Sequence, residues 1–342
     1  MQARVVRIGL NTALLVTTIV FCLVLIEIGI RIFFPSYDPS GQVQLFGLSD
    51  GTVVGRPGAV LRQSKNTGDY DVHVRFNSFG FRDDKLLTAA TDRDLFVVGD
   101  SFPFGWGVEV QDRFSDKLQS ILSRPVFNIA IPGLDFDGYS RLLRYAETHG
   151  TIIKNLIISV TMENDLGVYD DSETPASPPP SPRRSPLQLQ LSMIKAYFTG
   201  HSALYVAATH AVHKTGWLRS IAAQLGLLIP NLDGIPDPVG STDVLTTSAA
   251  RVLQLAKGRN TIVLIIPSRQ LWVGTATYRA EAARIHETFI DSLRRSGMVV
   301  VDLRDRFERD GKPLSYHFAN DGHWNKEGHR LAAEALAEVL QP

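Results

Sequence analysis

The chain has 342 residues, enough to bury one large core, and its 35 basic and 35 acidic side chains give a formal net charge of zero. This balance offers no global field for nucleic acid or an anionic surface, so nucleic-acid binding is not expected. The single cysteine, Cys22, excludes an intramolecular disulfide and a cysteine-based zinc site.

The first predicted element is a membrane-spanning helix. Residues 8–26, IGLNTALLVTTIVFCLVLI, carry no charge and as a helix are long enough to cross a bilayer. Arg4 and Arg7 precede the run, so the positive-inside bias places the N-terminus in the cytoplasm and the later residues outside. A cleaved signal peptide is the alternative, but no small-x-small cleavage site follows. We therefore predict a cytoplasmic N-terminus and an uncleaved single-pass anchor over residues 1–34.

Residues 35–90 form a polar stretch punctuated by glycine and proline. Within it, the alternating segment YDVHVRFN, residues 70–77, has the period of two that is typical of a strand. We predict a β-rich collar or linker here.

Strands and helices alternate over residues 91–342. The runs LFVV, VFNIAI, NLIISVT, TIVLIIP and MVVVDL are short and continuously apolar, as strands of a parallel sheet covered on both faces must be. Helical spacing places Ile285, Phe289 and Leu293 on one face, and Leu331, Ala335 and Val339 on one face of the last helix. The pattern predicts a doubly wound, flavodoxin-like α/β domain with about five parallel strands and helices on both faces.

An insertion at about residues 172–240 interrupts the alternation. Its first part, Ser172 to Pro186, is too rich in proline for a regular element, and the part that follows has helical spacing and several aromatic residues. The insertion is either a helical cap over a site or a set of helices that packs against the sheet.

Gly99-Asp100-Ser101 follows the first predicted strand directly. Ligands bind at the carboxyl ends of strands in open α/β sheets, so a serine in a glycine turn at that point is placed for nucleophilic attack. By itself the tripeptide is a weak signal, because an ordinary turn serine has the same surroundings.

The C-terminal segment NDGHWNKEGH supplies a candidate base, His323. A histidine accepts a serine proton near neutral pH, and the carboxylate of Asp321 can fix its tautomer. His329, in the same segment, is predicted to lie on the exposed first turns of the last helix.

Two further residues follow predicted strands, Gly133 and Asn164. Acyl transfer builds negative charge on the former carbonyl oxygen, and the backbone N–H groups of Ser101 and Gly133 with the Asn164 amide would supply three donors to it. The structural alternatives are a turn glycine for Gly133 and a helix N-cap for Asn164 or Asp165.

The order GDS, IPG, END and DGH resembles the SGNH (GDSL) hydrolase superfamily, over roughly residues 95–340. The resemblance implies a serine nucleophile at Ser101, an oxyanion hole completed by Gly133 and Asn164, and a base at His323 with its carboxylate. The preceding segment FNSFGFRDDK resembles the lead-in of membrane-anchored bacterial members linked with envelope polysaccharides, which implies a bacterial inner-membrane protein whose catalytic domain is periplasmic or extracellular.

The sequence departs from the family pattern at two points. Met162 and Glu163 precede Asn164 where Gly-x is usual. The usual Asp-x-x-His spacing would place a carboxylate at residue 320, which is Asn320, while Asp321 gives Asp-x-His, a spacing that resembles the alginate O-acetyltransferase-like branch. Either residue could support His323, and we favour Asp321 because only a carboxylate stabilises imidazolium.

The sequence predicts an esterase or O-acyltransferase that acts on acyl, mainly acetyl, esters of an envelope carbohydrate. A catalytically silent polysaccharide-binding module and a lipase-like esterase are the alternatives. No cofactor or metal is expected, because histidines are scattered and no phosphate-binding glycine pattern follows the first strand. Protein partners and the oligomeric state cannot be predicted.

Overall fold

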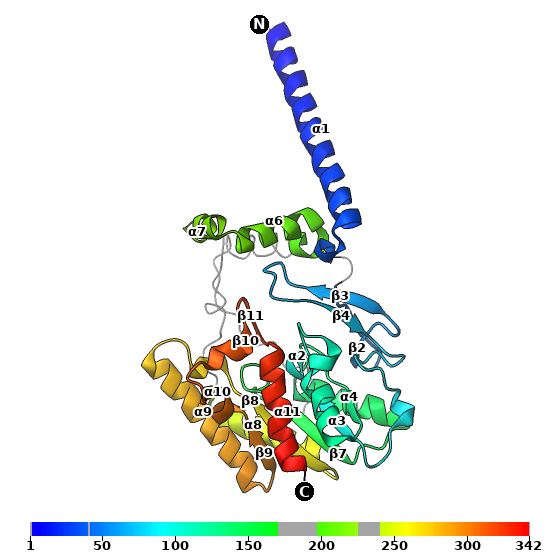
Figure 1. Ribbon diagram of the computed structural model, residues 1–342, viewed down its shortest axis with the longest axis vertical. Coiled ribbons are helices and arrows are strands. Elements are labelled where there is room, and N and C mark those ends of the chain that lie inside the picture. Colours follow the sequence, from blue (N-terminus) through cyan, green and yellow to red (C-terminus); the bar gives the residue numbers. More distant parts are fainter. Residues whose placement is uncertain (1, 40–41, 170–196, 225–239, 342) are drawn as a thin grey trace. The chain divides into compact units, whose positions relative to one another are not determined.

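The computed structural model describes residues 2–39, 42–169, 197–224 and 240–341, which fall into two compact units (Figure 1). The first unit contains the N-terminal segment to Gln42, a short stretch from Ser64 to Gly68, and the part of the chain between Arg183 and Leu228. The second unit contains the remainder.

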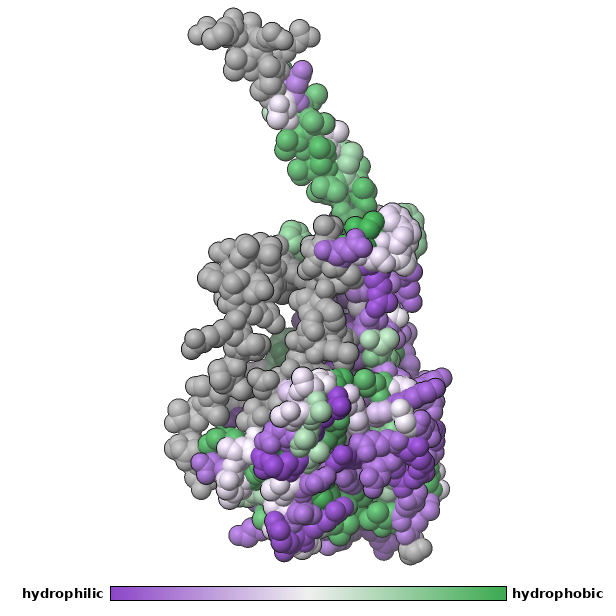
Figure 2. All heavy atoms as spheres, turned by 90° about the vertical axis from the view of Figure 1, so that its left-hand side faces the viewer, coloured by the Kyte–Doolittle hydropathy of each residue, from purple (hydrophilic) through white to green (hydrophobic). Residues whose placement is uncertain are grey.

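Helix α1, Gln2–Phe33, begins the first unit. Its candidate membrane span, Leu10–Phe33, extends further toward the C-terminus than the predicted run. Figure 2 shows mostly apolar side chains on the visible face of this span. One helix long and apolar enough to cross a membrane is therefore present near the N-terminus, as predicted.

Two helices of the insertion pack in the same unit as α1. They are α6, Ala203–Lys214, and α7, Gly216–Gln224, and the short helix η1, Pro35–Tyr37, lies beside α6. The insertion is helical here, as predicted, but its described helices pack with the end of α1, which neither alternative for the insertion anticipated. Its proline-rich segment lies outside the described residues.

The second unit is built on a five-stranded parallel sheet of order β6-β5-β7-β8-β9. This order confirms the predicted doubly wound, flavodoxin-like sheet, in which the chain reverses its direction of winding beside the first strand. The strands are β5 Leu95–Val98, β6 Val126–Asn128, β7 Asn155–Thr161, β8 Asn260–Ile266 and β9 Val299–Asp302.

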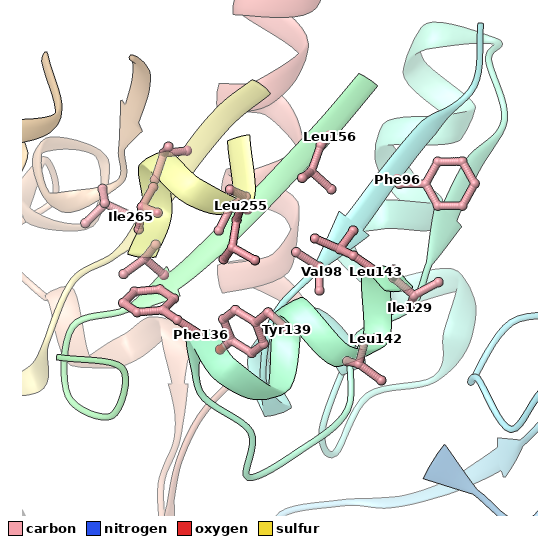
Figure 3. Packing of buried hydrophobic residues seen from close by; sticks show 14 of the residues in the cluster. Phe96, Val98, Ile129, Phe136, Tyr139, Leu142, Leu143, Leu156, Leu255 and Ile265 are labelled. Atoms are coloured by element: carbon pink, nitrogen blue, oxygen red, sulfur yellow. The ribbon is translucent and has the colours of Figure 1, made fainter. Parts of the chain in front are cut away.

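Helices cover both faces of this sheet. Successive strand residues point to opposite faces. Thus Phe96 and Val98 lie in one apolar cluster, and Leu95 and Val97 in another. Figure 3 shows the first cluster, in which side chains of α4 meet those of the strands. The helices of this cluster are α4 Phe136–Thr148, α8 Thr242–Ala256 and α9 Ala276–Arg295, and those of the other are α3 Phe114–Leu122, α10 Arg304–Glu308 and α11 Lys326–Leu340.

The predicted helix faces are confirmed with one exception. Ile285, Phe289 and Leu293 of α9 are buried, and so is Ala335 of α11. Val339 is 47% exposed, because it lies in the last turn of α11, where the helix is less buried than in the preceding turns.

Four short strands precede the sheet, including one within the alternating segment of the predicted collar. They are β1 Leu45–Gly47, β2 Val53–Gly55, β3 Val60–Ser64 and β4 Asp71–Arg75, paired as two hairpins. Short 3-10 helices follow at η3 Leu87–Ala89, η4 Val110–Asp112, η5 Arg269–Leu271 and η6 Pro313–Tyr316. The remaining elements, α2 Ser101–Phe104, β10 His317–Phe318 and β11 Asp321–Trp324, belong to the site.

The segment FNSFGFRDDK supports the loop that follows Ser101. The buried Arg82 donates to the carbonyl oxygens of Gly105 at 2.6 Å and Val108 at 2.7 Å. Burial, with the nearby Arg113, lowers the pKa of Arg82 to about 9. The segment therefore has a structural role in the fold, because it fixes the backbone next to the candidate nucleophile.

Candidate active site

Ser101 lies where β5 ends and α2 begins. Only glycine fits at residue 99, because a Cβ there would lie 2.5 Å from Cγ of Pro103 and 2.9 Å from Cβ of Ser159. Asp100 caps the short helix, its Oδ1 accepting from the Phe102 N–H at 3.0 Å. This tight turn holds Ser101, which is 8% exposed, at the carboxyl end of the sheet.

The structure brings Ser101, His323 and Asp321 into one hydrogen-bonded chain. The distance between Ser101 Oγ and His323 Nε2 is 2.8 Å, and His323 Nδ1 contacts Asp321 Oδ1 at very short range. The His323 backbone N–H also donates to Asp321 Oδ1, at 3.0 Å. With a proton on Nδ1, Nε2 is free to accept the serine hydroxyl proton, which is the arrangement of a serine–histidine–aspartate triad.

Asn320 does not support the imidazole. Its backbone N–H and its side-chain amide both donate to Asp69 Oδ1, each at 3.2 Å. The carboxylate partner of His323 is thus Asp321, the residue that we favoured because only a carboxylate stabilises imidazolium.

The carboxylate of Asp321 has a further partner that the sequence did not predict. The hydroxyl of Tyr70 donates to Asp321 Oδ2 at 3.1 Å and accepts from Trp106 Nε1 at 2.8 Å. Burial, together with the charge of Asp321, raises the pKa of the Tyr70 hydroxyl, which therefore stays neutral and able to donate. Tyr70 is 251 positions from Asp321, and no local motif links them.

Asn164 lies just beyond β7, and its amide reaches across to the Ser101 turn. Asn164 Nδ2 donates to Asp100 Oδ2 at 3.3 Å, while Asp100 Oδ1 accepts from Thr161 Oγ1 at 3.0 Å. These bonds hold the Asn164 side chain beside the residue that precedes the nucleophile. No described helix begins at residue 164 or 165, so the N-cap alternative was wrong.

Gly133 occupies a turn after β6 with a φ of 76°, in the left-handed region that glycine tolerates best. Ile131 N–H donates to the Gly99 carbonyl oxygen at 3.1 Å, which keeps this turn alongside the Ser101 turn. The oxyanion roles of Gly133 and Asn164 stay predictions, and their placement after the two strands that flank β5 is compatible with those roles.

Asp165 is a structural residue beneath the site. It is fully buried, and its carboxyl oxygens lie 3.0 Å from the Tyr139 hydroxyl, while Oδ2 accepts from the Thr161 N–H at 2.8 Å. Burial, with the nearby Asp100, raises the pKa of Asp165 well above its usual range. The residue fixes the end of β7 and so the position of Asn164.

The unusual Glu163 pairs with Arg269 at the edge of the site. Arg269 donates to Glu163 through its backbone N–H at 2.6 Å and through Nη2 at 2.8 Å. The guanidinium also lies against Gly322, where a Cβ would be 2.5 Å from Arg269 Cζ. Glu163, which stands in the segment where the family pattern has Gly-x, therefore links the end of β7 through Arg269 to the turn between Asp321 and His323.

The prediction for His329 was wrong. The side chain is 1% exposed, and its Nδ1 accepts from the Phe114 N–H at 3.4 Å. Burial, with Arg113, Arg82 and Lys117 nearby, lowers its pKa to about 3. The ring faces α3 because that helix packs on α11, a long-range contact that the last helix's own sequence does not reveal.

In the described part of the chain, no group of three or more histidine, cysteine, aspartate or glutamate side chains has a metal-binding arrangement. The titratable groups brought together at the strand ends are those of the serine–histidine–aspartate chain and its supports.

Comparison with known proteins agrees with this class of site. Residues 240–342 match the family model of the SGNH hydrolase-like domain, acetyltransferase AlgX. The part of the chain that carries Asp321 and His323 is thus similar to the SGNH hydrolase-like domain of AlgX.

Solved structures similar to this chain include a member of the lipolytic G-D-S-L family from Veillonella parvula. Its sequence identity is 16% and the TM-score is 0.41, and the match covers 72% of this chain and 97% of that one. Another is a catalytic mutant of Axe2, an acetylxylan esterase from Geobacillus stearothermophilus, with 11% identity and a TM-score of 0.39. That match covers 74% of this chain and 96% of the esterase chain. A comparison with curated proteins finds no match.

Proposed function

We propose that the protein is a membrane-anchored serine esterase or O-acyltransferase that acts on acyl, chiefly acetyl, esters of an envelope carbohydrate. The observation that carries the proposal is the continuous hydrogen-bonded chain from Ser101 Oγ through His323 to Asp321. This constellation is defined by geometry and serves acyl transfer on unrelated folds.

The chemistry has two half-reactions. In the first, Ser101 Oγ attacks the acyl carbonyl carbon while His323 Nε2 takes the hydroxyl proton, and the same nitrogen returns it to the leaving alkoxide. An acyl-serine ester remains. In the second, His323 takes a proton from water or a sugar hydroxyl, whose oxygen attacks the ester carbonyl, and then returns the proton to Ser101 Oγ.

The strand-end donors supply the electrostatic part of this reaction. The Ser101 and Gly133 backbone N–H groups and the Asn164 amide would bind the oxyanion of each tetrahedral intermediate. Loss of one such donor typically costs about 2.7–4 kcal/mol in the barrier. For Asn164 to act, its amide must turn from Asp100 Oδ2 toward the substrate, and the long 3.3 Å bond between them favours that exchange.

Two features favour a carbohydrate ester as the substrate and transfer as the outcome. The family model that matches residues 240–342 is named for an acetyltransferase, and the Asp321 and His323 spacing follows that branch. The anchor and the position of Arg4 and Arg7 before it favour a catalytic domain on the periplasmic face, where envelope polysaccharides are modified.

The direct test is turnover of p-nitrophenyl acetate by the full chain in detergent, compared with Ser101→Ala. We expect the variant to lose about 10⁴-fold or more of kcat, because removal of the nucleophile leaves only binding and oxyanion stabilisation. Ser120→Ala, which removes an exposed hydroxyl on α3, is the matched control and should retain wild-type turnover.

Equal turnover by wild type and Ser101→Ala would refute the proposal. Failure of folded wild-type protein to react with a fluorophosphonate would favour the silent polysaccharide-binding module instead. Faster turnover of phospholipid than of acetylated sugar would favour the lipase-like alternative.

A further inference from the structure

The insertion helices are attached to the end of α1 through Glu27. The Glu27 carboxylate accepts hydrogen bonds from Ser202 Oγ at 2.9 Å and from the backbone N–H groups of Ala203 and Leu204, each at 2.8 Å. These groups form the first turn of α6, where free N–H groups and the helix dipole both favour an anion.

Arg31 completes this junction. It donates to Glu27 Oε1 at 2.8 Å, to Asp38 Oδ1 at 2.6 Å and to the His201 carbonyl oxygen at 2.7 Å. One arginine thus joins α1, the residue after η1 and a residue two positions before α6. Such a built contact favours retention of α1 in the mature protein, since cleavage of the helix would leave the start of α6 without its partner.

The junction also sets the level of α6 relative to a membrane. At 1.5 Å per residue, Glu27 lies about 25–30 Å along α1 from the start of its apolar run, and a hydrocarbon core is about 30 Å thick. A core of that thickness, counted from the start of the run, would end close to Glu27 and so close to the start of α6. In Figure 1, α6 and α7 (green) run sideways from the end of α1 instead of continuing its line.

One side of α6 is occupied by contacts within the unit. Thr209 Oγ1 accepts from Asn66 Nδ2 at 3.1 Å, and the His210 ring lies 5.3 Å from the ring of Tyr37. The other side carries Leu204, Ala208 and Ala211, at the i, i+4, i+7 spacing of one helix face. Both alanines are exposed, and none of the three residues is charged.

Helix α7, which contacts α6, also exposes apolar side chains, and these are larger. Trp217 is 66% exposed and Ile221, four residues later, is 47% exposed on the same face. Tyr197 and Phe198, just before α6, are also exposed. Between residues 202 and 224 the sequence has no acidic residue, and Lys214 and Arg219 are its formally charged side chains.

We propose that α6 and α7 lie in the outer interface of the bilayer, with Trp217 and Ile221 inserted among the lipids. Tryptophan prefers this depth, because its ring is apolar while its N–H remains near the headgroups. An uncharged face with basic flanks suits a monotopic helix, and the basic residues favour anionic lipids. The insertion would then be a second membrane contact beside the anchor. This inference depends on α1 spanning the membrane.

The test uses the full chain in nanodiscs that hold one copy each, with acyl chains either plain or brominated. Bromine quenches tryptophan at contact, so we expect brominated lipid to lower the emission and most of the decrease to disappear in Trp217→Phe. Trp272→Phe is the matched control, because Trp272 belongs to the second unit and should not alter the decrease.

The inference is overturned if Trp217→Phe shows the same quenching as wild type, if aqueous iodide quenches Trp217 in place of brominated lipid, or if neither quencher reaches it. Flotation with vesicles separates this result from failure of the anchor. A chain that floats while Trp217 remains unquenched contradicts only the interfacial placement of α6 and α7, and a chain that does not float contradicts the anchor.

Glu27→Gln tests the junction itself. The variant loses the charge on the group that holds the first turn of α6, so we expect weaker quenching of Trp217 with unchanged flotation. Unchanged quenching would show that Glu27 does not hold α6 at the membrane, and Glu287→Gln, an exposed carboxylate on α9, is the control.

Discussion

Ser101 and His323 lie within hydrogen-bonding distance because each follows a glycine in a tightly packed turn. Gly99 allows the chain to pass close to Pro103 and Ser159, and Gly322 gives the backbone room beside the Arg269 side chain. Neither position can accept a Cβ without displacing its neighbours. At the residue scale, the site depends on backbone geometry as much as on the groups that react.

Tyr70 is a positioning residue for the triad, because it touches Asp321 and not the reacting atoms. Tyr70→Phe removes the donor to Asp321 Oδ2 and the acceptor for Trp106. We expect kcat to fall about 10-fold to 100-fold with KM unchanged, the range of a hydrogen bond to a charged group. Steady-state kinetics on p-nitrophenyl acetate measures both constants.

The matched control is Tyr145→Phe, which removes a hydroxyl that donates to the Phe79 carbonyl oxygen outside the site. If both variants lower kcat equally, or if Tyr70→Phe raises KM alone, Tyr70 does not position Asp321.

At the element scale, the packing of α3 against α11 encloses a neutral histidine. The pKa of folded His329 is lowered to about 3, so below its ordinary value of about 6.5 the unfolded chain binds a proton that the folded chain does not. The contribution of His329 to the free energy of unfolding is therefore fully present above that pH. It declines as the pH falls, by up to about 1.4 kcal/mol per pH unit. His317, which burial also holds near a pKa of 3, contributes in the same direction.

We expect the free energy of unfolding to decrease between pH 7 and pH 5, and to decrease less steeply in His329→Gln, which keeps an acceptor for the Phe114 N–H. Denaturant unfolding at a series of pH values measures the slope. His149→Gln, at an exposed histidine, should retain the wild-type slope. An identical slope in His329→Gln would mean that His329 is protonated in the folded protein.

The elements themselves were predictable wherever a local pattern determines them. Five apolar runs predicted five strands, and because parallel strands end at one edge, the residues after them were expected to converge. The errors at His329 and Val339 concern exposure, which depends on how α11 packs against distant parts of the chain. Tyr70 was missed for a related reason, since its partner comes from a distant part of the chain.

At the scale of the whole molecule, the unexpected feature is that the insertion packs with α1. Glu27 and Arg31 are the only acidic and basic residues between residue 8 and residue 34, and the sequence gives no sign of what they bind. They bind each other, the side chains of Asp38 and Ser202, and backbone groups at the start of α6, and the backbone groups have no sequence signature. An apolar anchor was predictable from composition, whereas its contact with the insertion required the fold.

The central claim is that Ser101 carries the acyl group during turnover. The most direct measurement is mass spectrometry of the full chain, mixed with an acetyl ester and quenched with acid before turnover is complete. The account predicts a gain of one acetyl group on the peptide that contains Ser101, and no gain on that peptide in Ser101→Ala. Turnover with no acetyl group on Ser101, or with the acetyl group on another residue, would contradict it.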